Sequence, residues 1–316
     1  MTAVRPREQG PSAFGEAFLQ DPGLFPGRRS GETWGEREIA FELAGGAYVF
    51  SGLEPSQADA LDGRFGSRVV GPGGSRVETL VFCVEARQFR ELERGRPYTF
   101  DLDYSRASVR LAGPGFMARL DWTPDLRGAL WTAAPGTSFG GAFENYFRVL
   151  LAYRLLDLGG ALVHSAGVRD EAGGGYLLFG PSGAGKSTFA RLAREAGASV
   201  LHDDLNPLCR GQGSTALKAL PLSGDIGLGP GAAPPEAPLR ALCRLRQSET
   251  DSLRPLHLSE ALASLLACCP FVGRDPYRAD QLLQNLESLV RGVPAYELSF
   301  ALAGRSWTLL REAVQA

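Results

Sequence analysis

A glycine-rich stretch from Gly180 to Thr188 carries the residue types that bind a polyphosphate, and it matches every position of the pattern G-x-x-x-x-G-K-[ST]. In such a loop the glycines let consecutive backbone N–H groups turn toward phosphate, and the N-terminus of the next helix adds about half a positive charge. Lys186 would reach the β- and γ-phosphates, and the Ser187 hydroxyl would bind Mg²⁺. The residues predicted to hold the nucleotide are Gly180, Ser182, Gly183, Ala184, Gly185, Lys186, Ser187 and Thr188.

Local patterns on both sides place this loop between a strand and a helix. Residues 176–179 are apolar enough for a buried strand, and residues 188–196 have a helical pattern that Gly197 ends. Lys186 is one of only two lysines among 33 basic residues. An arginine-rich chain therefore retains an ammonium here, where a compact charge fits and a planar guanidinium would collide with the backbone.

Two adjacent carboxylates, Asp203 and Asp204, follow the next predicted strand, residues 198–201. In a parallel sheet the carboxyl ends of the strands open on one crevice, so both carboxylates should face the bound phosphates. One could accept the proton of an attacking hydroxyl while the other holds Mg²⁺. The alternative is that Asp204 only caps a turn into residues 205–207. The pattern assigns Asp203 to catalysis and Asp204, with Ser187, to the metal.

A histidine, His164, is expected at the end of the strand that begins at Ala161, in front of the loop strand. If these two strands are neighbours, His164 lies beside the same crevice and could take part in proton transfer. A structural hydrogen bond is the alternative role. His202 should point to the opposite face of its extended segment from Asp203 and is interpreted as structural.

The composition excludes several function classes. The formal net charge is −2 and the arginines are scattered among acidic residues, which argues against a nucleic-acid surface. The sequence contains neither an apolar run of about 18 residues nor the core of a signal peptide, so we expect a cytoplasmic protein without a membrane partner. The five cysteines show no zinc spacing and are expected to be reduced and structural. A homo-oligomer remains open.

The chain is expected to divide into a flexible extension at 1–35, a mainly antiparallel β domain at 36–140 and an α/β domain at 141–316. A helix at 142–158 opens the last domain, and the Pro-rich residues 230–238 would form an excursion or lid over the site. Further helices are predicted at 259–267, 279–291 and 307–313, with a strand at 293–302. Leu283 is among the residues expected to face inward.

Three segments together resemble the C-terminal domain of HPr kinase/phosphorylase: residues 162–167, the loop 180–187 and residues 200–204. The resemblance covers residues 159–210 and extends more loosely to the end of the chain. It implies an α/β P-loop kinase fold related to phosphoenolpyruvate carboxykinase, preceded by the mainly β N-terminal domain. It also implies Mg·ATP-dependent phosphorylation of a serine hydroxyl of a protein or peptide, with Asp203 as base assisted by His164, beside Lys186.

The sequence departs from that family at two places. The second family motif, a glutamate before an Arg-Gly-Leu-Gly-like run, has no clear counterpart, and Glu236 or Asp225 could replace its acid. The N-terminal β domain does not match either, so a partner other than HPr is expected. Two alternatives stay open: a small-molecule P-loop kinase, and an ATP-binding module without catalysis. The choice between ATP and GTP, and a reverse phosphorolysis, are likewise open.

Overall fold

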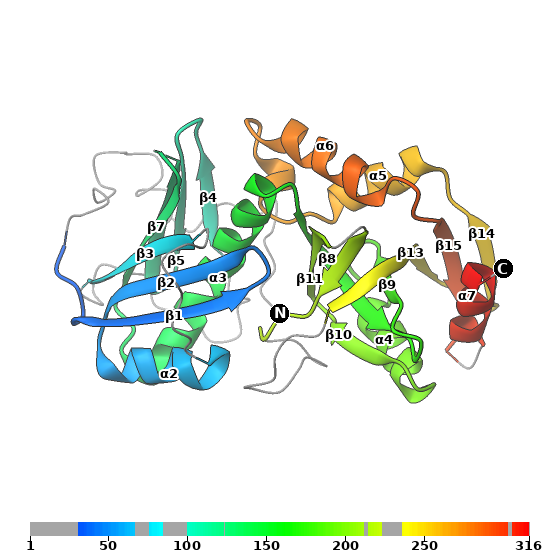
Figure 1. Ribbon diagram of the computed structural model, residues 1–316, viewed down its shortest axis with the longest axis horizontal. Coiled ribbons are helices and arrows are strands. Elements are labelled where there is room, and N and C mark those ends of the chain that lie inside the picture. Colours follow the sequence, from blue (N-terminus) through cyan, green and yellow to red (C-terminus); the bar gives the residue numbers. More distant parts are fainter. Residues whose placement is uncertain are drawn as a thin grey trace. The chain divides into compact units, whose positions relative to one another are not determined.

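A computed structural model describes residues 31–66, 76–84, 100–122, 124–211, 214–222, 236–302 and 305–315. These residues form a mixed α/β fold with six α-helices (Figure 1). The chain divides into two compact units, Met1–Arg154 with Asp275–Tyr277, and Leu155–Arg274 with Arg278–Ala316. Most of the expected extension (1–30), Asp225 and most of the expected lid (230–235) lie outside the described residues.

Within the described ranges, the first unit contains one seven-stranded sheet in the order β1-β2-β3-β7-β6-β5-β4. Neighbouring strands are antiparallel except at β2–β3 and β3–β7, which are parallel. Residues 31–35 also pair with this sheet, through a bridge between Thr33 and Phe82. The strands are β1 (Arg37–Leu43), β2 (Gly46–Leu53), β3 (Arg76–Cys83), β4 (Asp101–Tyr104), β5 (Ser108–Gly113), β6 (Phe116–Trp122) and β7 (Leu126–Thr132).

Helices α2 (Pro55–Phe65) and α3 (Gly136–Asp157) belong largely to this unit. The aromatic side chains of α3 pack on those of the first strands, as in the pair Phe41 and Phe147, whose ring centroids are 5.7 Å apart. Helix α3 begins six residues before the predicted 142, because the apolar packing of Phe139 outweighs the low helix propensity of Gly140 and Gly141. The division between the units falls within α3, whereas the sequence analysis placed a boundary in front of it.

The second unit is built on an eight-stranded sheet of order β10-β8-β11-β12-β13-β15-β14, with β9 paired to both β13 and β8. Strands β8 and β9 form an antiparallel hairpin, while β9, β13 and β15 run parallel. The strands are β8 (Ala161–Arg169), β9 (Gly175–Phe179), β10 (Ser199–His202), β11 (Leu205–Arg210), β12 (Thr215–Lys218), β13 (Glu236–Gln247), β14 (Ser252–Pro255) and β15 (Ala295–Phe300).

Four helices and a short 3₁₀ turn complete this unit: α4 (Lys186–Glu195), α5 (Leu258–Ala267), a turn at Val272–Arg274, α6 (Ala279–Val290) and α7 (Ser306–Gln315). Residues of α4, α7 and the central strands share one apolar cluster, in which Phe189 meets Phe300 edge to face at 5.2 Å. The prediction that Leu283 faces inward is wrong, since it is 41% exposed on α6. The residue before it, Leu282, and the residue about one turn later, Leu286, are the buried ones.

The twelve-residue strand β13 was missed by the sequence analysis, which placed residues up to Pro238 in an excursion. Glu236, Ala237 and Pro238 instead pair with β12, where Ala216 lies opposite Pro238. Buried and exposed residues alternate along the first half of β13. Charged side chains such as Arg240 and Arg244 on one face hid this pattern, although the other face is buried.

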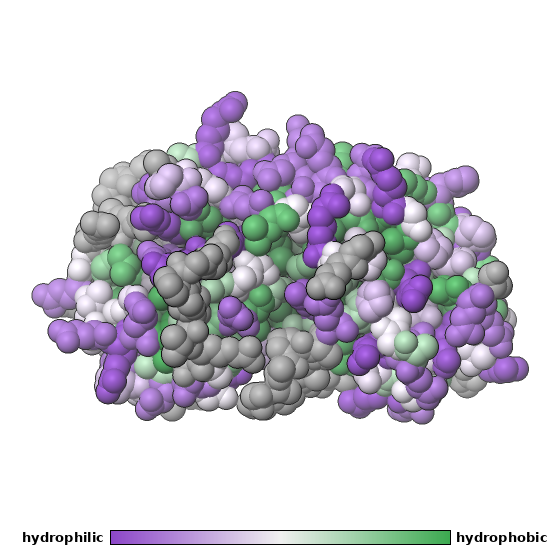
Figure 2. Space-filling view, in the orientation of Figure 1, coloured by the Kyte–Doolittle hydropathy of each residue, from purple (hydrophilic) through white to green (hydrophobic). Residues whose placement is uncertain are grey.

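Hydrophilic residues cover most of the face shown in Figure 2, with hydrophobic residues appearing in small groups between them. Large apolar side chains that are exposed occur singly, for example Leu158 and Leu302, as is normal for a folded chain. Among the residues described, no helix is both long and apolar enough to cross a membrane.

Candidate functional site

The loop between β9 and α4, residues 180–185, is called the glycine loop below. Its three glycines have positive φ angles of 150° at Gly180, 82° at Gly183 and 91° at Gly185, a region that other residues rarely adopt. A side chain at Gly185 would also bring its Cβ to 2.6 Å from the Phe300 ring. The glycines are therefore required by the backbone conformation and, at Gly185, by packing as well.

The N-terminus of α4 follows the glycine loop directly. The first N–H of this helix to bond back is that of Phe189, which donates to the Gly185 carbonyl at 2.8 Å. The preceding N–H groups have no intrahelical acceptor, as at every helix start, and so remain for a ligand. The Gln247 side chain steadies the loop from β13, because its amide donates to the Gly183 carbonyl at 3.0 Å.

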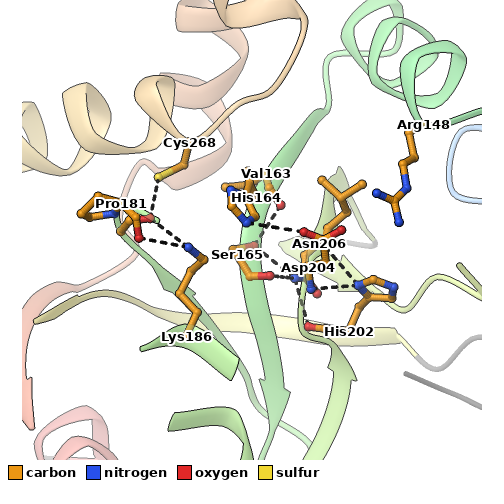
Figure 3. Close-up of polar contacts among 12 residues, drawn as sticks. Arg148, Val163, His164, Ser165, Pro181, Lys186, His202, Asp204, Asn206 and Cys268 are labelled. Atoms are coloured by element: carbon orange, nitrogen blue, oxygen red, sulfur yellow. Dashed lines mark hydrogen bonds and ion pairs between the residues drawn. The ribbon is translucent and has the colours of Figure 1, made fainter. Parts of the chain in front are cut away.

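Lys186 lies at the first position of α4 with its ammonium turned back over the glycine loop (Figure 3). Its Nζ donates to the carbonyl oxygens of Gly180 at 3.1 Å and Pro181 at 3.2 Å. The side chain is buried, and burial lowers the pKa of Lys186 below its ordinary value, while Cys268 and then Asp204 act in the opposite direction.

The hairpin register brings His164 level with the start of the glycine loop. Ser165 of β8 lies opposite Phe179 of β9, so the preceding residue, His164, is beside Gly180. The expectation that His164 ends its strand is wrong, because β8 continues to Arg169. The small residues that follow it, including Gly167, continue the strand since they are covered by neighbouring strands on both sides.

Strand β11 runs antiparallel to β8 and places Leu205 opposite His164, which brings Asp204 alongside. The Asp204 backbone carbonyl accepts the Ser165 N–H at 3.0 Å. Its carboxylate Oδ1 lies 3.4 Å from His164 Nε2, with 43% of the His164 and 31% of the Asp204 side chain exposed. Figure 3 shows the two side chains pointing toward each other. The pair is accessible to a substrate.

The predicted partner of His164 was Asp203, whereas the contact observed is with Asp204. Asp203 is only 5% exposed. The two neighbouring carboxylates therefore have different surroundings, one buried and one beside an exposed imidazole. Such a difference is how two carboxyl groups take separate roles at one site.

The His202 ring organises the turn that carries both aspartates. Its Nδ1 accepts the backbone N–H of Asp204 at 3.1 Å and of Leu205 at 3.0 Å. Its Nε2 lies 3.3 Å from the Leu222 carbonyl, so the neutral form with a proton on Nε2 satisfies all three contacts. The ring is fully buried. His202 therefore holds the turn in place, in agreement with the structural role interpreted from the sequence.

Asn206 was not singled out in the sequence, yet it ties the aspartate turn to β8. Its side-chain amide donates to the Ser165 carbonyl at 2.8 Å and to the His202 carbonyl at 3.2 Å. The residue is fully buried. Only the strand register reveals this role, since β8 and β11 are distant in sequence.

No three or more His, Cys, Asp or Glu side chains gather as a metal site in the part of the chain that the structure describes. Ser187 and Asp204, the residues predicted to bind Mg²⁺, offer a hydroxyl and a carboxylate oxygen, which suit that hard cation. Glu236, the proposed substitute acid, instead pairs with Lys218 at 3.2 Å across β12 and β13. Its role at the site stays a prediction.

Comparison with protein families matched residues 147–315 to the family described as SynChlorMet cassette protein ScmC. A comparison with curated proteins found no significant match. Among solved structures, the Hpr(Ser) kinase/phosphatase from Coxiella burnetii matches 49% of this chain and 87% of its own, at 12% identity and a TM-score of 0.28. A relation this distant leaves the activity to be argued from the site itself.

Proposed function

We propose that this chain, which belongs to the SynChlorMet cassette protein ScmC family, transfers the γ-phosphate of Mg·ATP to a hydroxyl group. The observation that carries the proposal is the geometry of the glycine loop, where three glycines with positive φ precede α4 and the buried Lys186 ammonium turns back over the loop. The partly exposed His164–Asp204 pair lies beside the start of that loop, because the β8–β9 register places His164 level with Gly180. Phosphoryl transfer needs this combination, because the donor must be held while charge and a proton are handled beside it.

The donors of the glycine loop fit a polyphosphate. The start of α4 supplies backbone N–H groups, Lys186 supplies a positive charge, and Gly183 leaves open space where a side chain would project. The oxygen atoms of Ser187 and Asp204 fit Mg²⁺, which is usually held by one or two protein groups together with phosphate oxygens. When bound, Mg·ATP would supply the phosphoryl group and neutralise its charge.

Each side chain has a proposed task in this reaction. Lys186 turns from the loop carbonyls to hold the β- and γ-phosphate oxygens. Asp203 accepts the proton of the attacking hydroxyl, and its burial supports a site from which water is excluded. His164 keeps the Asp204 carboxylate in position through their 3.4 Å contact. The aspartate turn is preorganised by His202, so little rearrangement accompanies the reaction.

The proposed acceptor is a serine hydroxyl of a protein or peptide. The family description names a cassette, so the first acceptors to test are the products of genes encoded next to this one. We place the reaction in the cytoplasm, where the five free thiols would remain reduced.

The test is transfer of labelled γ-phosphate from ATP to proteins encoded nearby and to those of a cell lysate. The intact chain should label an acceptor in the presence of Mg²⁺, and Lys186→Ala should lose labelling by about 10³-fold or more, since the phosphates lose their main charged contact. Lys218→Ala, which removes the other lysine of the chain, is the matched control and should retain activity. Equal activity in both variants would contradict the assignment.

The alternative of an ATP-binding module makes a different prediction. Such a module would bind Mg·ATP with the same dependence on Lys186, yet no acceptor would become labelled. Calorimetric binding and the labelling assay together therefore separate binding from catalysis.

A further inference from the structure

The C-terminal end of α5 touches two parts of the nucleotide site through one residue, Cys268. Its thiol lies 3.5 Å from the Gly180 carbonyl oxygen, and its own backbone carbonyl accepts the N–H of His164 at 2.7 Å. Figure 3 shows the thiol directed at the same carbonyl to which Lys186 turns. One residue thus reaches both the glycine loop and the strand that carries His164.

The Gly180 carbonyl has two donors, the ammonium of Lys186 at 3.1 Å and the thiol of Cys268 at 3.5 Å. Both contacts are buried. A buried carbonyl without any hydrogen-bond donor costs free energy. If the Gly180 carbonyl lost both donors on phosphate binding, the bound state would be destabilised. When Lys186 turns to a phosphate, the carbonyl keeps a partner only if the thiol remains.

Cys268 is suited to act as a donor rather than as a nucleophile. Only 8% of the residue is exposed, and burial raises the pKa of its thiol above the ordinary value. The thiol therefore keeps its proton at neutral pH and donates it to the carbonyl.

The chain beyond Cys268 is also held in an unusual conformation. Phe271 has φ of 64°, the one positive φ outside glycine among the described residues. The Val272 N–H donates to the Pro270 carbonyl at 2.7 Å across it, which closes a γ-turn. The Phe271 side chain is buried. Packing that maintains such a strained turn keeps the end of α5 at a defined position.

We propose that Cys268 is a positioning residue of the nucleotide site, whose thiol remains as the donor to the Gly180 carbonyl when Lys186 turns to bind phosphate. The inference rests on the proposed function. It predicts that the thiol increases affinity for nucleotides without touching them. The Cys268 carbonyl contact with His164 persists in any side-chain variant, so substitutions isolate the effect of the thiol.

The experiment measures the dissociation constant of Mg·ADP by calorimetry for the full chain and for three variants. Cys268→Ala should weaken binding by about 3- to 10-fold, because the carbonyl loses its remaining donor. Cys268→Ser should bind within about 2-fold of the unaltered chain, since a hydroxyl is also a donor. Cys269→Ala removes the same atom from the adjacent buried position and is the matched control, with affinity expected to be unchanged.

Thermal unfolding of each variant separates affinity from stability. Equal weakening by Cys268→Ala and Cys269→Ala would overturn the inference, as would a serine variant as weak as the alanine variant. If Cys268→Ala does not fold, the serine variant decides alone: binding weakened by about 5-fold or more overturns the proposal. An unaltered chain that does not bind Mg·ADP would overturn the proposed function together with this inference.

Discussion

In the first unit a buried polar pair bonds where a helix packs on its sheet, whereas in the second unit several buried polar residues lie near the glycine loop. Thr79 and Tyr146 share a buried hydrogen bond of 2.8 Å where α3 covers the sheet. In the second unit His202, Asp203 and Lys186 are all buried, at the end of β10, in the turn after it and at the start of α4. The partly exposed side chains of His164 and Asp204 lie beside this second group.

The difference distinguishes polar groups that support packing from those that we propose to serve chemistry. A buried pair between a helix and its sheet stabilises the packing only if both members are present. A buried lysine at the end of the glycine loop, with the partly exposed His164–Asp204 pair level with the start of that loop, is an arrangement that we propose meets a ligand. Four predictions test this contrast between the units.

The largest effect is expected from Asp203→Asn. The amide cannot accept a proton, so the phosphotransfer rate should fall by about 10² to 10⁴-fold while the affinity for Mg·ADP is retained. Rates with saturating ATP and calorimetry measure the two quantities. Asp170→Asn is the control: Asp170 is also a buried carboxylate of this unit, bonded to the Gly174 N–H at 2.7 Å in the hairpin turn at the far end of β9. A similar loss of rate in Asp203→Asn and Asp170→Asn would contradict the assignment of Asp203 as the base.

Phe147→Ala should destabilise the first unit by about 3–5 kcal/mol, because it leaves a cavity among stacked aromatic rings. Urea unfolding followed by tryptophan fluorescence reports the loss, since Trp34, Trp122 and Trp131 belong to this unit. Under folded conditions the affinity for Mg·ADP should stay within about 2-fold. Nucleotide binding that falls together with this stability would contradict the separation of the site from the aromatic core.

The hydroxyl group of Tyr176 is expected to make the unfolding free energy of the second unit depend on pH in the alkaline range. Burial, followed by the hydrogen bond to Asp170, raises its pKa from 10.0 to about 12. The unfolded chain loses this proton first, so a stability contribution of about 3 kcal/mol, present below pH 10, should be lost between pH 10 and 12. Urea titrations across this range should show a smaller loss for Tyr176→Phe. If the unfolding free energy fell equally with pH in the unaltered chain and in Tyr176→Phe, the prediction would be contradicted.

The smallest effect is expected from His202→Ala, which leaves the N–H groups of Asp204 and Leu205 without their acceptor. We expect a loss of about 1–3 kcal/mol in unfolding free energy and a slower phosphotransfer, as the aspartate turn loosens. His257→Ala, at the exposed start of α5, should cost less than about 1 kcal/mol. If His202→Ala kept normal stability and a normal phosphotransfer rate, the aspartate turn would not depend on the His202 ring.

The sequence predicted the surroundings of the glycine loop because the signals there are local. The strand before it and the helix after it were placed within two residues of β9 and α4. Glycines at 183 and 185 are needed for backbone angles that depend on their own positions alone. The approximate place of the aspartate turn, directly after a short strand, was likewise confirmed.

What the sequence did not predict depends on contacts between distant segments. The hydrogen bond from the Cys268 thiol to the Gly180 carbonyl joins residues that are far apart in the chain. The contact of His164 with Asp204 follows from the register between β8 and β11. The sheet was expected to be parallel at the site, yet β8 is antiparallel to its neighbours there. Register and strand direction are set by tertiary packing, which no local pattern reveals.

The parallel pairings of β3 have a consequence for how the first unit assembles. On one side of β3 lies the hairpin β1–β2, and on the other the antiparallel run β4–β7, each joined by neighbours in sequence. Both pieces can form early from nearby residues, whereas β3 pairs with β2 and β7 across long intervening segments. We therefore expect the two halves of this sheet to appear first during folding, and β3 to join them in the slow final step.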